Sequence, residues 1–155
     1  MNVMIPILLK SKSAGIVNVS SSAALCSLAG TSIYSASKAA VKSMTESIRE
    51  EYRGRIYVGL VCPGFTKTDI FHNQNSGNES AASEKMLNMV STSCERMVDD
   101  IVNGIWKKKD NMVFGIDARM MKDSTRFFGV IVSKVSSEVI KKAHLEMFKD
   151  VFYSD

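Results

Sequence analysis

Three short hydrophobic segments stand out along the chain. They are Ile16–Val19, Ile56–Cys62 and Asn111–Gly115, and β-branched residues are frequent in the first two. Apolar runs of this length are typical of strands that are buried on both faces of a parallel sheet. We therefore predict three short strands, the second of which is ended by Pro63 and Gly64.

Longer segments with helical periodicity lie between and after these strands. Tyr34–Tyr52 separates the first two strands, and Glu95–Lys109 precedes the third. Two more amphipathic helices are predicted near Ala118–Phe127 and Val130–Phe148. A strand, a helix and a second strand in this order form a right-handed parallel crossover, so the pattern predicts an α/β fold.

The helix predicted at Tyr34–Tyr52 has one face of small side chains. The residues that recur on this face are Ala36, Ala39, Ala40, Ser43, Met44, Ser47 and Ile48. Small side chains allow close approach, so we expect this face to contact a sheet or another helix. The solvent face is expected to carry Glu46, Arg49, Glu50 and Arg53.

The other segments have less regular patterns. Met1–Lys10 is apolar and suits the last turns of a helix, yet no helix start precedes it, so the chain begins within a pattern. Phe71–Ser83 is rich in Asn, Ser, Gly, Gln and Glu and is expected to form a mobile loop, followed by a short helix at Glu84–Val90. No internal repeat or linker divides the chain.

Composition narrows the class of protein further. The 155 residues are 45% hydrophobic, which suffices for one core, and the formal charge of +4 is a mild excess. Lys107–Lys109 lies at a predicted helix end, where positive charge complements the helix dipole. We favour this interpretation over a nucleic-acid patch.

The three cysteines, Cys26, Cys62 and Cys94, are far apart in the sequence and do not have the spacing of metal ligands. A reducing, cytoplasmic setting is therefore expected. Val3–Leu9 is too short to span a bilayer and lacks the charges of a signal peptide.

Tyr34 and Lys38 are the first candidates for chemistry. Lys38 lies one turn after Tyr34 on the same helical face, where its ammonium favours the phenolate and lowers the pKa of the phenol. A phenol tuned in this way can exchange a proton with a carbonyl or alcohol oxygen. The alternative is an aromatic residue at a helix start followed by a solvated lysine, and the pair alone does not decide between them.

Ser21 strengthens the catalytic interpretation. It follows the first strand, at the carboxyl end of the predicted parallel sheet, where open α/β folds bind their ligands. A hydroxyl group at this position can hydrogen-bond the same oxygen that Tyr34 protonates. The alternative is that Ser20, Ser21 and Ser22 are turn residues only.

The segment Pro63–Thr68 closes the second strand at the same sheet edge. Pro63 ends the strand ladder and Gly64 allows the backbone to approach a ligand. The hydroxyl groups of Thr66 and Thr68, together with the backbone amides, can meet an amide or a phosphate. An ordinary turn remains the alternative.

Together these motifs resemble the C-terminal part of a classical short-chain dehydrogenase/reductase. The matching segments are Asn18–Ser21, then Tyr34–Lys38, which begins thirteen residues after Ser21, and then Pro63–Thr68. The resemblance covers residues 1 to about 70 and is diffuse beyond. It implies a Rossmann-like parallel sheet, of which this chain would hold the C-terminal half with about three strands, the first four being absent.

The resemblance also implies a role for each matching residue. Tyr34 would be the catalytic acid–base, Lys38 would lower its pKa and bind the nicotinamide-ribose hydroxyls, and Ser21 would orient the substrate oxygen. The thirteen-residue interval selects Ser21 from among its serine neighbours. The residues that would line the nicotinamide and the neighbouring phosphate are Pro63, Gly64, Thr66 and Thr68.

The implied cofactor is NAD or NADP, which supplies the hydride. The family's Gly-rich phosphate turn lies further upstream than this chain reaches, so we expect Met1 to be internal to a longer protein or to mark a truncation. The 155 residues alone would then bind cofactor weakly and turn over poorly. They would form one partial domain, with the catalytic core portion at 1–70, a substrate loop at 71–95, and the C-terminal helices and last strand at 96–155.

Three functional hypotheses follow. The first is an NAD(P)-dependent oxidoreductase that acts on a small-molecule carbonyl or alcohol, without nucleic acid, metal or membrane span. It would assemble as a homo-oligomer through the helices at Met1–Lys10 and Tyr34–Tyr52. The second is a non-catalytic module that pairs with another chain through the open, apolar edge of the strand at Ile16–Val19. The third is a membrane-surface role for the basic C-terminus, which carries Lys134, Lys141 and Lys142.

Overall fold

The computed structural model describes residues 3–67 and 89–142. Its strands are β1 (Gly15–Val19), β2 (Tyr57–Pro63) and β3 (Asn111–Phe114). Each strand lies within one residue of the predicted bounds, so the three-strand prediction is confirmed.

Helices surround these strands within the described ranges. They are α1 (Met4–Leu8), the 3-10 turn η1 (Ser22–Ala24), α2 (Ser32–Glu51), α5 (Cys94–Trp106), α6 (Ile116–Phe128) and α7 (Val130–Lys142). The predicted loop at Phe71–Ser83 and most of the helix predicted at Glu84–Val90 lie outside the described residues, as does the predicted helix beyond Lys142.

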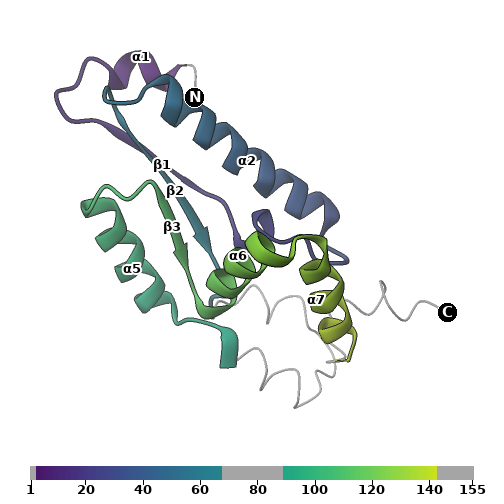
Figure 1. Cartoon of the computed structure of the whole chain (residues 1–155). Helices are drawn as coiled ribbons and strands as arrows, with labels where there is room; N and C mark the ends of the chain where they lie inside the picture. Colours follow the sequence, from purple (N-terminus) through teal and green to yellow (C-terminus); the bar gives the residue numbers. More distant parts are fainter. Residues whose placement is uncertain (1–2, 68–88, 143–155) are drawn as a thin grey trace.

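The sheet has the order β1-β2-β3, and both pairs of strands are parallel. Val19 pairs with Val61 at the end of β1, and Pro63 pairs with Phe114 at the end of β2. All three strands therefore end at one edge of the sheet, and α6 and α7 form a hairpin at this edge (Figure 1). This is the expected Rossmann-like α/β arrangement.

Helices cover both faces of the sheet. Helices α1 and α2 lie on one side, and α5 lies on the other (Figure 1). Two clusters of buried residues lie on opposite faces of the sheet: Ile5, Ile48, Ile56 and Val58 on the α2 side, and Val61, Met97, Met112 and Phe114 on the α5 side. Side chains that alternate along β2 therefore supply both clusters, as expected for a strand inside a parallel sheet.

The buried side of helix α2 differs from the small-residue face that was predicted to contact a sheet or another helix. Ser35, Thr45 and Ile48 are buried. Ile48 belongs to the small-residue face, whose other members are exposed: Ala36, Ala39, Ala40, Ser43, Met44 and Ser47. The sheet contact predicted for the small residues is therefore wrong, and their contact with another helix stays a prediction. The fit against the sheet is polar in part, because Asn18 Nδ2 donates a 2.9 Å hydrogen bond to Thr45 Oγ1.

Arg49 was predicted to face solvent, and this is wrong. Its guanidinium donates hydrogen bonds to the carbonyl oxygens of Val58 (2.8 Å) and Asp110 (2.6 Å), and its side chain is only 14% exposed. Its length allows it to reach across β2 to the chain before β3 and to satisfy backbone carbonyls there.

The first prediction concerns the core on the α5 side. Met112→Ala should lower the free energy of unfolding by about 2–5 kcal/mol, because Met112 is 1% exposed and its truncation leaves a cavity. Urea denaturation measures the change. Met120→Ala is the matched control, because Met120 is 64% exposed and its loss should change stability by less than about 0.5 kcal/mol. Equal losses in the two variants would contradict the assignment of the core.

Candidate active site

Ser20 ties the end of β1 to two neighbouring elements. Its N–H donates a 2.7 Å hydrogen bond to Val61 O in β2, and its Oγ donates a 2.7 Å bond to Lys38 O in α2. Ser20 is 2% exposed, so both donors are shielded from solvent. The end of β1 and the Lys38 turn of α2 are therefore held side by side.

Of the three adjacent serines, Ser21 has the most accessible side chain. Ser20 and Ser22 are buried, at 2% and 7% exposure, whereas Ser21 is partly exposed. Ser21 Oγ caps η1 by accepting a 3.2 Å hydrogen bond from the N–H of Ala23. A hydroxyl that accepts in this way keeps its own proton for donation, so Ser21 can still donate to a ligand.

Tyr34 and Lys38 lie on the same face of the first turns of α2. The helix begins at Ser32, two residues before the predicted start, and Tyr34 is 50% exposed. Lys38 Nζ lies 5.7 Å from the centroid of the Tyr34 ring. The contact predicted from their spacing is therefore present, and it places a cation against the phenol ring.

The Pro63–Gly64 turn begins where β2 ends. The N–H of Gly64 donates a 2.8 Å hydrogen bond to Phe114 O, which fastens the turn to the end of β3. Pro63 and Gly64 are half-buried. Thr68, the last residue predicted for the site, lies outside the described residues.

Beyond Gly64 the chain pairs with the segment before α5. Phe65 O accepts a 2.9 Å hydrogen bond from the N–H of Thr92, and Lys67 N–H donates a 2.9 Å bond to Thr92 O. Thr66 forms an isolated parallel bridge with Thr92, and its Oγ1 donates to Gly64 O at 3.2 Å. The turn is thus also fastened to the segment that precedes α5.

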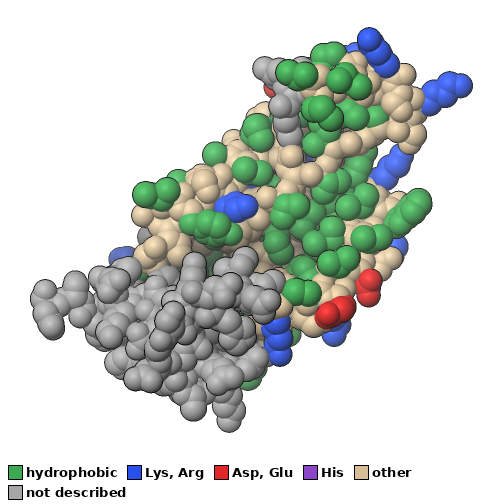
Figure 2. All heavy atoms as spheres, turned by 180° about the vertical axis from the view of Figure 1, so that it is seen from behind, with side chains coloured by type: hydrophobic (Ala, Val, Ile, Leu, Met, Phe, Trp, Pro, Cys, Tyr) green, Lys and Arg blue, Asp and Glu red, His purple; other side chains and the backbone are tan. Residues whose placement is uncertain are grey.

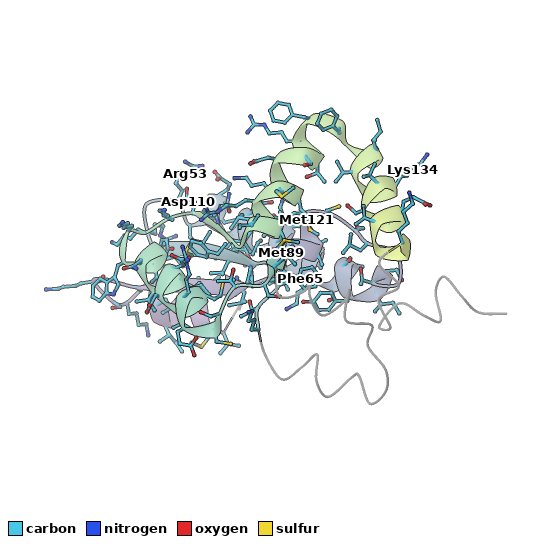
Figure 3. The ribbon with its side chains drawn as sticks, turned by 90° about the horizontal axis from the view of Figure 1, so that it is seen from below. Arg53, Phe65, Met89, Asp110, Met121 and Lys134 are labelled. Atoms are coloured by element: carbon cyan, nitrogen blue, oxygen red, sulfur yellow. The ribbon has the colours of Figure 1, made fainter. Side chains whose placement is uncertain are left out.

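Asp117 is a part of this turn that sequence reasoning missed. Its Oδ2 accepts a 2.8 Å hydrogen bond from the N–H of Phe65, and the residue is only 8% exposed. Figure 3 shows Phe65 beside α6, the helix that carries Asp117 and Met121. The available signal was an acidic residue at the start of the helix that follows the third strand, near the sheet edge where the other strands end.

The Asp117 carboxylate fits this place because two glycines surround it. A Cβ atom on Gly64 or on Gly115 would overlap Asp117 Oδ1. Gly115 also has φ +101°, a conformation that other residues rarely adopt. Burial raises the pKa of Asp117 above its ordinary value of 3.8, against a smaller lowering by nearby backbone amides, of which that of Phe65 has the largest effect.

The described ranges 3–67 and 89–142 contain no cluster of His, Cys, Asp and Glu residues that could hold a metal ion. Among the helices of these ranges, none has the length and apolar character that crossing a membrane requires.

Comparison with known proteins gives the family. Residues 1–79 match the sequence model of the family described as short chain dehydrogenase. The chain therefore belongs to the short-chain dehydrogenase family, as the ordered motifs predicted.

Two curated relatives show how far the similarity extends. The protein called SadH in Mycobacterium tuberculosis is 30% identical over 132 residues, which are 81% of this chain and 48% of SadH. A 3-oxoacyl-[acyl-carrier-protein] reductase from Synechocystis is 38% identical over 71 residues, which are 45% of this chain and 29% of that protein. This chain spans about half the length of SadH.

Solved structures share the fold. A short chain dehydrogenase from Burkholderia cenocepacia, crystallised in complex with NADP, superimposes with a TM-score of 0.70 at 24% identity. The match covers 87% of this chain and 52% of that one. A short-chain dehydrogenase from Streptomyces avermitilis gives a TM-score of 0.63 at 25% identity and covers 87% of this chain and 56% of that one.

The second prediction tests the packing of the turn. Gly64→Ala should lower the free energy of unfolding by about 1–3 kcal/mol, because its Cβ overlaps the buried Asp117 carboxylate. Adding Asp117→Ala removes the overlapping atom, so the double variant should lose at least about 1 kcal/mol less than the sum of the two single losses. Thermal and urea unfolding measure both quantities. Additive losses would contradict the contact.

The third prediction concerns the charge of Asp117. A carboxyl group with a raised pKa in the folded state binds its proton more tightly there than in the unfolded chain. Stability should therefore fall as the pH rises from about 3.8 through the raised pKa, and remain lower above it. Asp117→Asn should remove this contribution, so the stability difference between variant and wild type should grow in favour of the variant over that window. A difference that does not change with pH would refute the assignment.

Proposed function

We propose that this chain forms the catalytic part of an NAD(P)-dependent oxidoreductase that acts on a carbonyl or alcohol. The observation that supports this most strongly is the meeting of three segments at one sheet edge. Ser20 holds the end of β1, with Ser21 beside it, against the Lys38 turn of α2, and β1 pairs with β2 directly before the Pro63–Gly64 turn. Membership of the short-chain dehydrogenase family supports a shared role for these residues in catalysis and cofactor binding.

The residues at this edge suit the nicotinamide half of NAD or NADP. Lys38 provides an ammonium for the ribose hydroxyls, and the turn from Pro63 to Thr66 provides backbone and hydroxyl groups for the carboxamide and the adjacent phosphate. We include Thr68 in this set from its place in the motif. When bound, the cofactor would supply or accept the hydride at the substrate carbon.

The chain's own residues would handle the substrate oxygen. Ser21 would donate a hydrogen bond that orients this oxygen, and Tyr34 would give it a proton during reduction or take one during oxidation. Lys38, at 5.7 Å from the Tyr34 ring centroid, would stabilise the negative charge left on the phenol oxygen. Tyr34 is half-exposed, so a small carbonyl or alcohol can reach it.

Assembly and compartment belong to the same proposal. The exposed small residues of α2 suit a close helix–helix contact, so we expect a homo-oligomer that packs this face against a second copy. Cys26, Cys62 and Cys94 are free thiols, which supports a reducing compartment such as the cytoplasm.

The long side of β1 that does not face β2 favours a second candidate function. β2 is the one strand paired with β1 among those described, and Val19 at its end is 54% exposed. Figure 2 shows hydrophobic side chains gathered on the face behind the view of Figure 1. An open edge and an apolar surface suit pairing with another chain without catalysis. Cofactor binding distinguishes the candidates, because a pure pairing module needs none.

The fourth prediction tests the catalytic role of Tyr34. Tyr34→Phe should lower turnover of NAD(P)H with small ketones and aldehydes by about 100-fold or more, because it removes the proton donor. Cofactor affinity, measured by fluorescence titration of NADH and NADPH, should stay within about twofold, because the ring and Lys38 remain.

Tyr52→Phe is the matched control, because Tyr52 lies at the far end of α2. It should leave both turnover and cofactor affinity unchanged. Wild-type turnover in Tyr34→Phe, or no saturable cofactor binding by the wild type, would contradict the proposed function.

A further inference from the structure

We propose that Asp117 is a positioning residue of the cofactor site, which fixes the Phe65 amide and thereby sets the backbone of the Pro63–Thr66 turn. The inference rests on the proposed function, because that function assigns this turn to the nicotinamide side of the cofactor. Asp117 lies 52 residues after Phe65 in the sequence and outside the motifs that define the family resemblance.

The Asp117 side chain forms its hydrogen bond with a residue that is distant in the sequence. Asp117 is the second residue of α6, where an acidic side chain commonly stabilises its own helix. Here Oδ2 instead accepts the N–H of Phe65, which lies 52 residues earlier in the sequence. The bond therefore links α6 to the turn after β2.

Phe65 is the residue at which the turn is held from both sides. Its N–H donates to Asp117, and its carbonyl accepts from the N–H of Thr92. The preceding residue, Gly64, donates its N–H to Phe114 at the end of β3. Without Asp117 the peptide between Gly64 and Phe65 would lose this bond to α6. The carbonyl of the same peptide accepts the Thr66 hydroxyl, so the orientation of that hydroxyl would be less constrained.

The burial of the Asp117 carboxyl group lowers the stability of the fold, which indicates a role beyond packing. Asp117 is 8% exposed, and its Oδ1 has no hydrogen-bond partner within the described residues. Burying a carboxyl group with an unsatisfied oxygen lowers stability. A leucine would avoid this cost but would leave the Phe65 N–H without its acceptor. A residue that lowers stability while it orients a turn is expected where the geometry of that turn serves binding.

Three substitutions in the full chain separate positioning from packing. Asp117→Leu keeps the shape and removes the acceptor, whereas Asp117→Asn keeps an acceptor oxygen for the Phe65 N–H. Asp123→Leu is the matched control, because Asp123 is an exposed residue of the same helix. The probe is reduced nicotinamide mononucleotide, which carries the nicotinamide, its ribose and one phosphate.

Asp117→Leu should raise the Kd of the probe about tenfold or more, because the turn is no longer held in its binding geometry before the ligand arrives. Asp117→Asn should stay within about threefold of wild type, and Asp123→Leu should equal it. In an NMR spectrum the Phe65 amide proton should move upfield in Asp117→Asn by more than the amide protons of the sheet, such as that of Val61. This second measurement does not depend on the folding of Asp117→Leu.

Two results would overturn the proposal in different ways. If the wild type binds the probe and Asp117→Leu binds it equally well, the positioning role is wrong and the proposed function stands. If the wild type binds none of the probe, the proposed function fails and the positioning role fails with it. An unmoved Phe65 amide resonance in Asp117→Asn would overturn the contact itself.

Discussion

The site depends first on how the end of β1 is held. Ser20 donates its N–H to Val61 in β2 and its hydroxyl to the carbonyl of Lys38 in α2, both at 2.7 Å. These two bonds from a buried residue join a strand, its neighbour and a helix at one point. Ser21 and Tyr34, which come from different elements, are thereby brought to the same edge of the sheet.

The second constraint lies one strand further along the same edge. The turn after β2 is fastened to β3 through Gly64 and to α6 through Phe65 and Asp117. Glycine at positions 64 and 115 makes room for the Asp117 side chain, at the cost of burying a carboxyl group. Rigid supports of this kind suit a site whose ligand groups are small hydroxyls and main-chain atoms, because such groups are placed only by the main chain.

Much of this arrangement could be predicted from the sequence, because local patterns decide it. Apolar runs predicted all three strands to within one residue, and helical spacing predicted the contact of Lys38 with Tyr34. Long-range contacts could not be predicted in this way. Arg49 was placed in solvent because periodicity ignores the reach of a long side chain, and it bonds carbonyls beyond its own helix. Asp117 was missed because its partner lies 52 residues away.

The central claim is that nicotinamide binds at the edge where β1 and β2 end. The most direct test is NMR cross-saturation from the nicotinamide protons of bound reduced nicotinamide mononucleotide to the tyrosine rings. The geometry predicts transfer to Tyr34. Tyr57 begins β2 at the opposite edge, where its hydroxyl donates to Lys109 O, so it should receive none. Transfer to Tyr57 without transfer to Tyr34 would contradict the account.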